Sequence, residues 1–472
     1  MQGKKKYQEK LFTNFQLSDR VPEDNFYRRL KGQLDLGWLY KSTAEFYGSE
    51  GQQSIDPVVF FKLLLIGYLE NIGSDRRIIN TVSMRLDMLY FIGYDIDEQL
   101  PWHSTLSRTR QLYSPEVFKA LFVEVLKECI KKGMVSGHRQ VIDSAFVKAN
   151  AGMDSLEEKK ILEAGELYVT SLKEEEEPGD DNTAGSNKTH RSSSDGDARM
   201  STKPGKPTQL NYLSQVSVDG GGNRIITNIE AHHADKRDSA CLAEVVAHTI
   251  ENLESALLEV KEVVADSSYS SATALEYLEQ QGLKGYIPNL GPYKIVREGF
   301  TYDADQDVYR CSQGTKLEYK KTVLTHSGRY KKIYLSNRKD CSGCVLLATC
   351  VGEKTKSVTK KITVTADKPL YDRMHEIMQT VKGKRMMKFR QCTVEPVLGT
   401  LINFMGMRRV NTRGLEQAQK CMLMAAIAYN LKKLLKFCTP KTAEPMKMIR
   451  KWHQKVLETL FTRPEHLYYA IT

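Results

Sequence analysis

The hydrophobic pattern of the chain changes its period near residue 137, and this change limits the folds that are open to it. Before this point apolar residues recur at helical spacing, and after it come short apolar runs of strand length. A Gly-Gly-Gly-Asn turn at 220–223 joins two of these runs as a β-hairpin. The order predicts a mixed α/β sheet with helices packed against it. The predicted strands lie at 139–147, 210–218, 224–231, 260–265 and 285–288, and the helices between them at 238–257 and 271–281.

Helix start signals mark the region up to about residue 136. Asp56 followed by Pro57 predicts one helix start, because Asp accepts backbone N–H groups as an N-cap and Pro fits the first turn. Ser114-Pro115-Glu116 predicts another. Several short helices with basic residues are typical of a DNA-binding or dimerising bundle, and a helical packing domain is the alternative.

We expect five parts along the chain. A helical domain at 1–136 precedes an α/β core in two pieces, 137–290 and 371–438, which a small cysteine-bearing insertion at 291–370 interrupts. Within the first piece, 156–207 is rich in Glu, Gly, Asp, Ser, Asn and Thr, which predicts a flexible polar segment. Residues 439–472 form a C-terminal tail.

Positive charge is concentrated in the last third of the chain. The whole chain has a formal net charge of +11, yet 371–451 contains 17 Lys and Arg against 5 Asp and Glu, and 311–361 contains 12 against 3. Such a concentration indicates a site for a polyanion, and solvated lysine faces are the alternative.

Composition and pattern exclude several classes. The longest apolar run, 58–69, is too short for a membrane span of about 20 residues. The basic N-terminus has no apolar stretch behind it, so no signal peptide is expected. Nine cysteines in 472 residues are too few for a disulfide scaffold, which favours the reducing cytoplasm.

Three carboxylates occupy positions where chemistry is expected. Asp143 lies inside an apolar strand, where an unpaired charge is costly. Asp266 follows a predicted strand directly, at the end where α/β sheets bind ligands. Glu395 is the only acid between Glu376 and Glu416, in a basic region. Three such groups together would repel one another unless cations lay between them, and their hard oxygens suit Mg²⁺ or Mn²⁺.

Four cysteines of the insertion have metal-ligand spacing. Cys341 and Cys344 form a Cys-x₂-Cys pair that Cys311 and Cys350 would complete as a four-thiolate zinc site. Unligated cysteines in a small β-rich insertion are the alternative. Basic residues flank these cysteines and suggest that the insertion touches DNA: Lys320, Lys321, Lys331, Lys332, Arg338 and Lys339.

His232 and His233 lie beside Asp235, but adjacent side chains on a strand point to opposite faces. We therefore do not expect both histidines to bind one ion.

Several motifs, in order, resemble a bacterial insertion-sequence transposase of the DDE type, in the branch with a cysteine-bearing insertion. Three blocks resemble its catalytic motifs: Ile142-Asp143-Ser144-Ala145-Phe146-Val147 with Ala149-Asn150; Ala265-Asp266-Ser267-Ser268-Tyr269-Ser270; and Arg390 with Val394-Glu395-Pro396-Val397-Leu398-Gly399, Arg408-Arg409 and Arg413-Gly414-Leu415. The segment before the second predicted strand is similar at Ser194-Asp195, Asp197-Ala198-Arg199 and Tyr212. The N-terminal match comprises Leu34-Asp35-Leu36, Tyr47-Gly48, Ile55-Asp56-Pro57-Val58, Phe61-Lys62, Ser74-Asp75-Arg76 and Pro101-Trp102-His103-Ser104-Thr105-Leu106-Ser107-Arg108.

The resemblance implies a ribonuclease H-like domain in which Asp143, Asp266 and Glu395 bind two Mg²⁺ or Mn²⁺ ions. It implies binding of double-stranded DNA at terminal inverted repeats, strand cleavage, and joining of 3′-OH ends to target DNA, by a homodimer at least when DNA is bound. It places the protein in the bacterial cytoplasm, associated with the nucleoid. The DNA contacts expected from the matching motifs are Arg108, Tyr269, Arg390, Arg408, Arg409 and Arg413.

Two other functions remain open from the sequence. The Lys that commonly follows the catalytic glutamate by two turns is replaced here by Ile402 and Asn403. This departure motivates a catalytically impaired DNA-binding descendant as the alternative, and a general nuclease with the same core is a further one.

Overall fold

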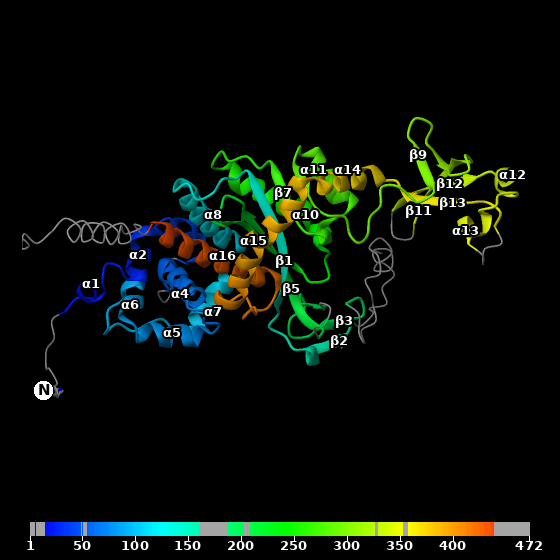
Figure 1. Cartoon of the computed structure of the whole chain (residues 1–472). Helices are drawn as coiled ribbons and strands as arrows, with labels where there is room; N and C mark the ends of the chain where they lie inside the picture. The colour runs from blue at the N-terminus through cyan, green and yellow to red at the C-terminus, as the bar shows by residue number, and fades with distance from the viewer. Residues whose placement is uncertain are drawn as a thin grey trace, which may run out of the picture.

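The structure is a computed structural model that describes residues 5, 15–48, 50, 54–159, 187–202, 205, 207–325, 329–352 and 357–438. N-terminal helices lie at one end, a mixed sheet lies in the middle, and a small second sheet projects at the other end (Figure 1). The predicted tail at 439–472 and most of the predicted flexible segment, 160–186, lie outside the described residues.

The N-terminal helices α4 and α8 begin where the sequence predicts. The Asp56 carboxylate accepts the backbone N–H groups of Val58 (2.7 Å) and Val59 (3.0 Å), and Pro57 occupies the first turn of α4. Gly93 ends α6 in the left-handed conformation (φ 93°), which glycine adopts without strain. The helices are α1 Leu17–Arg20, α2 Phe26–Gln33, α3 Leu39–Ser42, α4 Pro57–Leu69, α5 Asp75–Ser83, α6 Leu86–Ile92, α7 His103–Leu112 and α8 Pro115–Lys131.

The central sheet has β1 (Arg139–Lys148) between β5 (Gln209–Asp219) and β7 (Glu262–Val264). β5 runs antiparallel to β1 and to the outer strand β6 (Ile226–His233), whereas β7 and β8 (Lys284–Tyr286) run parallel to β1. This order confirms the predicted ribonuclease H-like mixed sheet. The short strand β4 (Arg199–Ser201) extends the sheet beside β5.

Helices cover both faces of the sheet. α10 (Asp238–Glu254) and α11 (Ala272–Gln280) pack on one face, and α15 (Val381–Phe404) and α16 (Leu415–Cys438) pack on the other. α14 (Lys368–Gln379) leads into α15 and packs beside α11.

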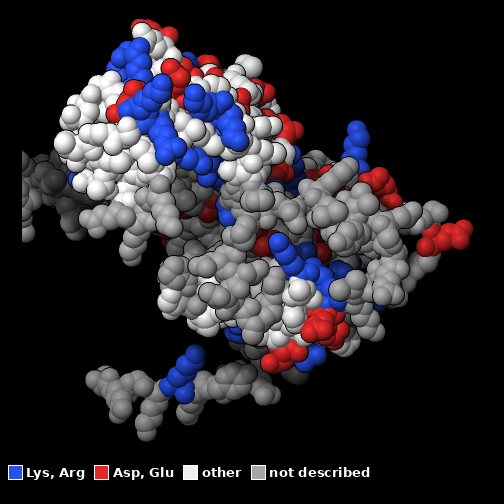
Figure 2. All heavy atoms as spheres, turned by 90° about the vertical axis from the view of Figure 1, so that its right-hand side faces the viewer, with Lys and Arg blue, Asp and Glu red and all other residues white. Residues whose placement is uncertain are grey.

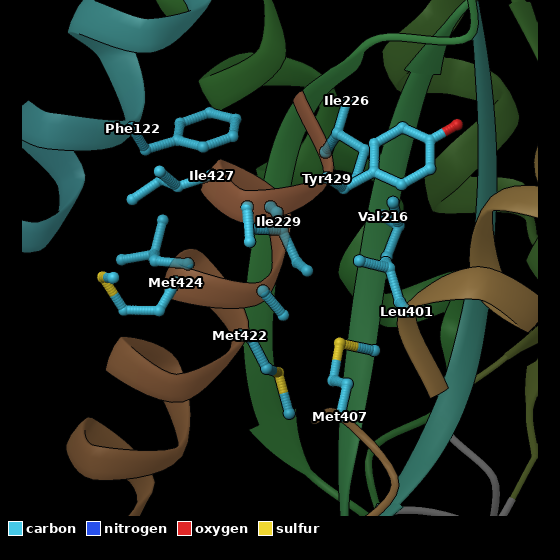
Figure 3. Close-up of a cluster of buried hydrophobic side chains, with 14 of the residues drawn as sticks. Phe122, Val216, Ile226, Ile229, Leu401, Met407, Met422, Met424, Ile427 and Tyr429 are labelled. Atoms are coloured by element: carbon cyan, nitrogen blue, oxygen red, sulfur yellow. The ribbon is translucent and has the colours of Figure 1, made fainter. Parts of the chain in front are cut away.

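Helix α16 is buried on nearly all sides, as a helix that is apolar all round must be. Figure 3 shows it between α8, which contributes Phe122, and the sheet, which contributes Val216 and Ile229. One continuous hydrophobic core therefore joins the N-terminal helices to the sheet.

The insertion has its own small core. Its five-stranded antiparallel sheet has the order β13-β12-β11-β10-β9 and buries Tyr309, Leu317, Tyr334 and Ile362. Its elements are β9 Phe300–Asp303, β10 Val308–Cys311, β11 Lys316–Leu324, β12 Tyr330–Ser336, α12 Arg338–Cys341, α13 Leu347–Val351 and β13 Lys361–Thr365.

The prediction of a polar loop through 156–207 is wrong for residues 187–202. This stretch contains β3 (His190–Ser192) and β4, and β3 pairs with β2 (Leu156–Glu158). The buried Asp195 accepts the Tyr212 hydroxyl (2.7 Å) and the Gly414 N–H (3.1 Å), and so ties the stretch to the start of α16.

Among the helices of the described ranges, none combines the length and the hydropathy that a bilayer span requires.

Candidate active site

Asp143 lies at the middle of the central strand β1. The pleat sends Asp143 towards α15, where Arg390 contacts it, and sends Ser144 towards Tyr269 on the α10 side. The Asp143 side chain is only 13% exposed. This burial raises the pKa of the carboxyl to about 6, although the charge of Arg390 and the Ser144 N–H act in the opposite direction. The strand thus holds an acid whose ionised form is costly to bury.

Arg390 of α15 joins two of the predicted acids. Its guanidinium donates to Asp143 Oδ2 (2.6 Å) and lies 3.5 Å from Glu395 Oε1. The Arg390 side chain is 12% exposed, so its charge also needs a partner. One cation therefore bridges two carboxylates that come from different elements.

Asp266 follows β7 and caps the short helix η3 (Ser267–Tyr269), where it accepts the Ser268 N–H (2.8 Å). The Ser268 hydroxyl contacts both Asp266 (2.5 Å) and Asp238 (2.9 Å), and it can donate its one proton to only one of them at a time. The charge of Asp266 is one of the causes that raise the pKa of Asp143. Asp266 therefore lies close enough to Asp143 for its negative charge to disfavour the ionised form of Asp143.

Tyr269 does not lie where a DNA contact requires. Its side chain is completely buried, and its hydroxyl donates to Gln215 on β5. Gln215 in turn donates to Asp238 Oδ1 (2.7 Å), the first residue of α10. The predicted DNA contact of Tyr269 is corrected accordingly: its aromatic ring fills the space between η3 and the sheet, and it positions the turn that follows Asp266.

Glu395 is the most open of the three acids, with 55% of its side chain exposed. It lies on α15, the same helix as Arg390, directly before Pro396. In the described residues the oxygens of Asp143, Asp266 and Glu395 do not all lie within 4.8 Å of one another, and the Arg390 guanidinium lies between two of these acids. Carboxylates are hard oxygen donors of the kind that Mg²⁺ and Mn²⁺ prefer.

Arg408, Arg409 and Arg413 are exposed and lie past the end of α15. Arg409 pairs with the last residue of β1, Lys148, as a parallel bridge, and its guanidinium donates to Asn150 (2.9 Å). Arg408 and Arg409 therefore lie at the end of β1, several residues along the strand from Asp143.

Arg108 is exposed on α7. Within the described part of the chain its guanidinium bonds only to Ser104 of the same helix. Its neighbour Arg110 is buried and forms a two-bonded pair with Asp75 of α5 (2.6 and 3.1 Å). The two arginines of α7 thus differ: one faces solvent and the other joins two helices.

The four cysteines of the insertion lie near one another. Burial raises the pKa of the Cys350 thiol, and Cys311, Cys341 and Cys344 contribute to the same shift, which requires that they are close. Cys341 also donates to Ser336 on β12 (3.1 Å). In the described residues their sulfurs do not form a group in which all ligand atoms lie within 4.8 Å of one another.

Basic side chains gather on the insertion. The insertion projects at the upper right of Figure 1, and Figure 2 views the molecule from that right-hand side. Lys and Arg side chains gather over the upper part of this face. The exposed basic residues of its described strands are Lys316, Lys320, Lys321, Lys331 and Lys361.

Sequence reasoning missed Gln215 and Asp238, which hold the Asp266 turn. The strand register could have indicated Gln215, because it lies directly opposite Ser144, the neighbour of Asp143. The sequence carries no comparable signal for Asp238, whose contact with Ser268 depends on how α10 packs.

Comparison with known proteins identifies the class of the chain. Residues 15–112 match the family model of a transposase domain (DUF772), and residues 310–435 match that of a transposase DDE domain. No curated protein matches the chain. The two family matches indicate an insertion-sequence DDE transposase, which confirms the resemblance and the enzyme class predicted from the sequence.

Two solved structures are similar at low identity. One is a piggyBac transposase synaptic complex with hairpin DNA, with 10% identity over 94% of this chain and 84% of that chain and a TM-score of 0.31. The other is a Mos1 transposase paired-end complex with the left transposon end, with 11% identity over 52% of this chain and 64% of that chain and a TM-score of 0.17.

Proposed function

We propose that this DDE transposase binds the terminal inverted repeats of its element, cuts DNA strands there and joins the 3′-OH ends to target DNA. The supporting observation is Asp143, whose side chain is only 13% exposed, whose pKa is raised, and which shares the Arg390 guanidinium with Glu395. A carboxylate that is costly to ionise in a buried strand is best explained by a cation that binds there.

In this proposal Asp143, Asp266 and Glu395 hold two Mg²⁺ or Mn²⁺ ions. When bound, such ions activate a water or a 3′-OH and stabilise the leaving oxygen of a phosphodiester. The protein holds the acids ready for them: β1 fixes Asp143, and the Ser268 N–H and hydroxyl orient Asp266. Arg390 neutralises Asp143 and Glu395 and would be released to hold a phosphate when cations take over that role.

In this proposal the exposed arginines contact the phosphates of the DNA backbone. Arg408 and Arg409 lie at the end of β1, Arg413 is exposed just before α16, Arg108 lies on α7, and the insertion presents further lysines. Contacts of this kind position a duplex through its phosphates and make binding depend steeply on salt. We assign the four cysteines of the insertion to one structural Zn²⁺, which would fix the insertion as a rigid DNA contact.

A homodimer forms in this proposal at least when DNA is bound, because two element ends have to be held together for joining. The reaction would take place on chromosomal DNA in the nucleoid.

The test uses a supercoiled plasmid that carries the gene with its natural flanking DNA, and a matched plasmid in which the flanks are replaced. We expect Mg²⁺-dependent breaks with 3′-OH ends at the element boundaries of the first plasmid only. Equal cutting of both plasmids would favour a general nuclease. Binding to the natural flanks without breaks in Mg²⁺ or Mn²⁺ would favour an impaired descendant.

The impaired alternative has one structural observation in its favour. Ile402, at the position where the family commonly has Lys, is partly buried and packs against the hydrophobic core. No cationic group is therefore contributed from this turn of α15.

A further inference from the structure

One group of side chains that could hold a metal ion lies between the outer strand β6 and helix α10. Glu230 and His232 of β6 and Glu244 of α10 each offer one ligand atom, and these atoms all lie within 4.8 Å of one another. Glu230 and His232 are buried, each with 8% of the residue exposed, whereas Glu244 is exposed at the rim.

Strand geometry selects one histidine of the His232-His233 pair. His233 points away and bonds through Nδ1 to the Asp197 carbonyl (2.8 Å). His232 shares the opposite face with Glu230, two residues before it, and its Nε2 lies 3.2 Å from Glu230 Oε2. The strand therefore pairs a histidine with a carboxylate, and not with its neighbouring histidine.

The two oxygens of Glu230 have different surroundings. Oε1 accepts from the Asn228 amide (2.6 Å) and from His248 Nδ1 (2.7 Å), a second imidazole that comes from α10. Oε2 faces His232. Metal-binding carboxylates are commonly oriented in this way, with a hydrogen-bonded oxygen behind and a ligand oxygen in front.

The spacing of His232 and Glu230 suits one shared ion. Two ligands at the usual 2.0–2.2 Å from a Zn²⁺ lie about 3.3–3.6 Å apart at the tetrahedral angle. The observed separation of 3.2 Å therefore needs almost no movement of either side chain. Glu244 offers a third ligand oxygen from its exposed position on α10, where its carboxylate also pairs with Lys236 (3.2 Å).

We propose that Glu230, His232 and Glu244 bind a divalent transition cation, with Zn²⁺ as the best match. The imidazole nitrogen disfavours Mg²⁺ and Ca²⁺, which prefer oxygen ligands alone.

This site is separate from the catalytic acids. In the strand register Glu230 lies opposite Gln215, and Gln215 lies opposite Ser144, so the site shares the α10 face of the sheet while Asp143 points to the other face. An ion here would fasten α10 to β6. Because Asp238 at the start of α10 contacts the Ser268 hydroxyl, the site would also steady the turn that carries Asp266.

The test compares bound Zn²⁺ in the full chain and in two variants of α10 after dialysis against a zinc buffer. Glu244→Gln removes one ligand at an exposed position, and Glu254→Gln is a matched control at an exposed position of the same helix. We expect Glu244→Gln to lower the Zn²⁺ affinity of this site about 100-fold. After dialysis the wild type and the control should therefore each retain one more Zn²⁺ per chain than Glu244→Gln.

A titration with Co²⁺ separates this site from the cysteines, because thiolate complexes of Co²⁺ absorb strongly in the near ultraviolet and nitrogen–oxygen complexes do not. The proposal predicts that Glu244→Gln loses only the second kind of complex. Equal Zn²⁺ content in all three proteins would overturn it and would leave Glu230 as the centre of a hydrogen-bond network alone.

Discussion

Replacing Asp143 by Asn should stabilise the metal-free protein while it removes a proposed metal ligand. Burial raises the pKa of Asp143 from 3.8 to about 6 in the folded chain. The folded state therefore binds this proton more tightly than the unfolded state does, and stability falls as the pH rises from 3.8 through about 6. Asn resembles the neutral acid, and its one side-chain oxygen can accept from either Arg390 or the Ser144 N–H, which bind different oxygens of Asp143.

The magnitude follows from the two pKa values. The ionisation of Asp143 costs about 1.6 kcal/mol of folding free energy at pH 5 and about 3 kcal/mol at pH 8. With an unfolding entropy of about 2.1 cal/mol/K per residue, 3 kcal/mol in a chain of this length corresponds to about 3 °C in Tm. Asp143→Asn should therefore raise the Tm by about 3 °C at pH 8 and by about half as much at pH 5.

Differential scanning calorimetry at both pH values, without divalent metal, measures this difference. Asp97→Asn is the control, because Asp97 is exposed in the N-terminal helical region. Added Mg²⁺ should raise the Tm of the wild type and leave that of Asp143→Asn unchanged. A lower Tm for Asp143→Asn at pH 8, or a gain that does not grow with pH, would refute the argument that Asp143 is a costly buried charge.

Three further predictions concern other parts of the chain. Arg409→Gln should weaken DNA binding and reduce the slope of log affinity against log salt by about 1, as measured by fluorescence anisotropy. Cys344→Ser should release the structural Zn²⁺ proposed for the insertion, as measured by metal analysis against wild type. Asp75→Ala should lower the free energy of unfolding by about 3–5 kcal/mol in urea, because it leaves the buried Arg110 without its ion-pair partner.

Each of these three results could come out otherwise. An unchanged slope of log affinity against log salt would mean that Arg409 does not contact a DNA phosphate. Full zinc content in Cys344→Ser would leave the cysteines unligated, the alternative that the sequence left open. A loss below about 1 kcal/mol for Asp75→Ala would mean that the Arg110 pair behaves as a surface ion pair.

The sequence predicted the sheet and the position of two acids for physical reasons that are local. Asp143 interrupts an apolar run, and Asp266 follows one directly, so both positions can be read without knowing how the helices pack. The hairpin and the alternation of strands and helices predicted a mixed α/β sheet, and the resemblance implied the ribonuclease H-like arrangement that the strand order shows.

Long-range packing explains what the sequence did not predict. Residues 187–202 are polar and resemble a loop, but Asp195 contacts Gly414, more than 200 positions away. Tyr269 lies within the second block that resembles the catalytic motifs, and only the packing of η3 on β5 shows that its ring is buried. The apolar surface of α16 shows that it is buried, but not that it lies between α8 and the sheet.

The most direct test of the central claim is Mg²⁺-dependent cleavage of the plasmid with natural flanks by the variants Asp143→Asn, Asp266→Asn and Glu395→Gln, with DNA binding measured in parallel. We predict that each variant binds this DNA as the wild type does and cleaves it at least about 1,000-fold more slowly, because each loses a proposed ligand of the catalytic ions. Cleavage at the wild-type rate by any of the three would contradict the assignment of that acid to the active site.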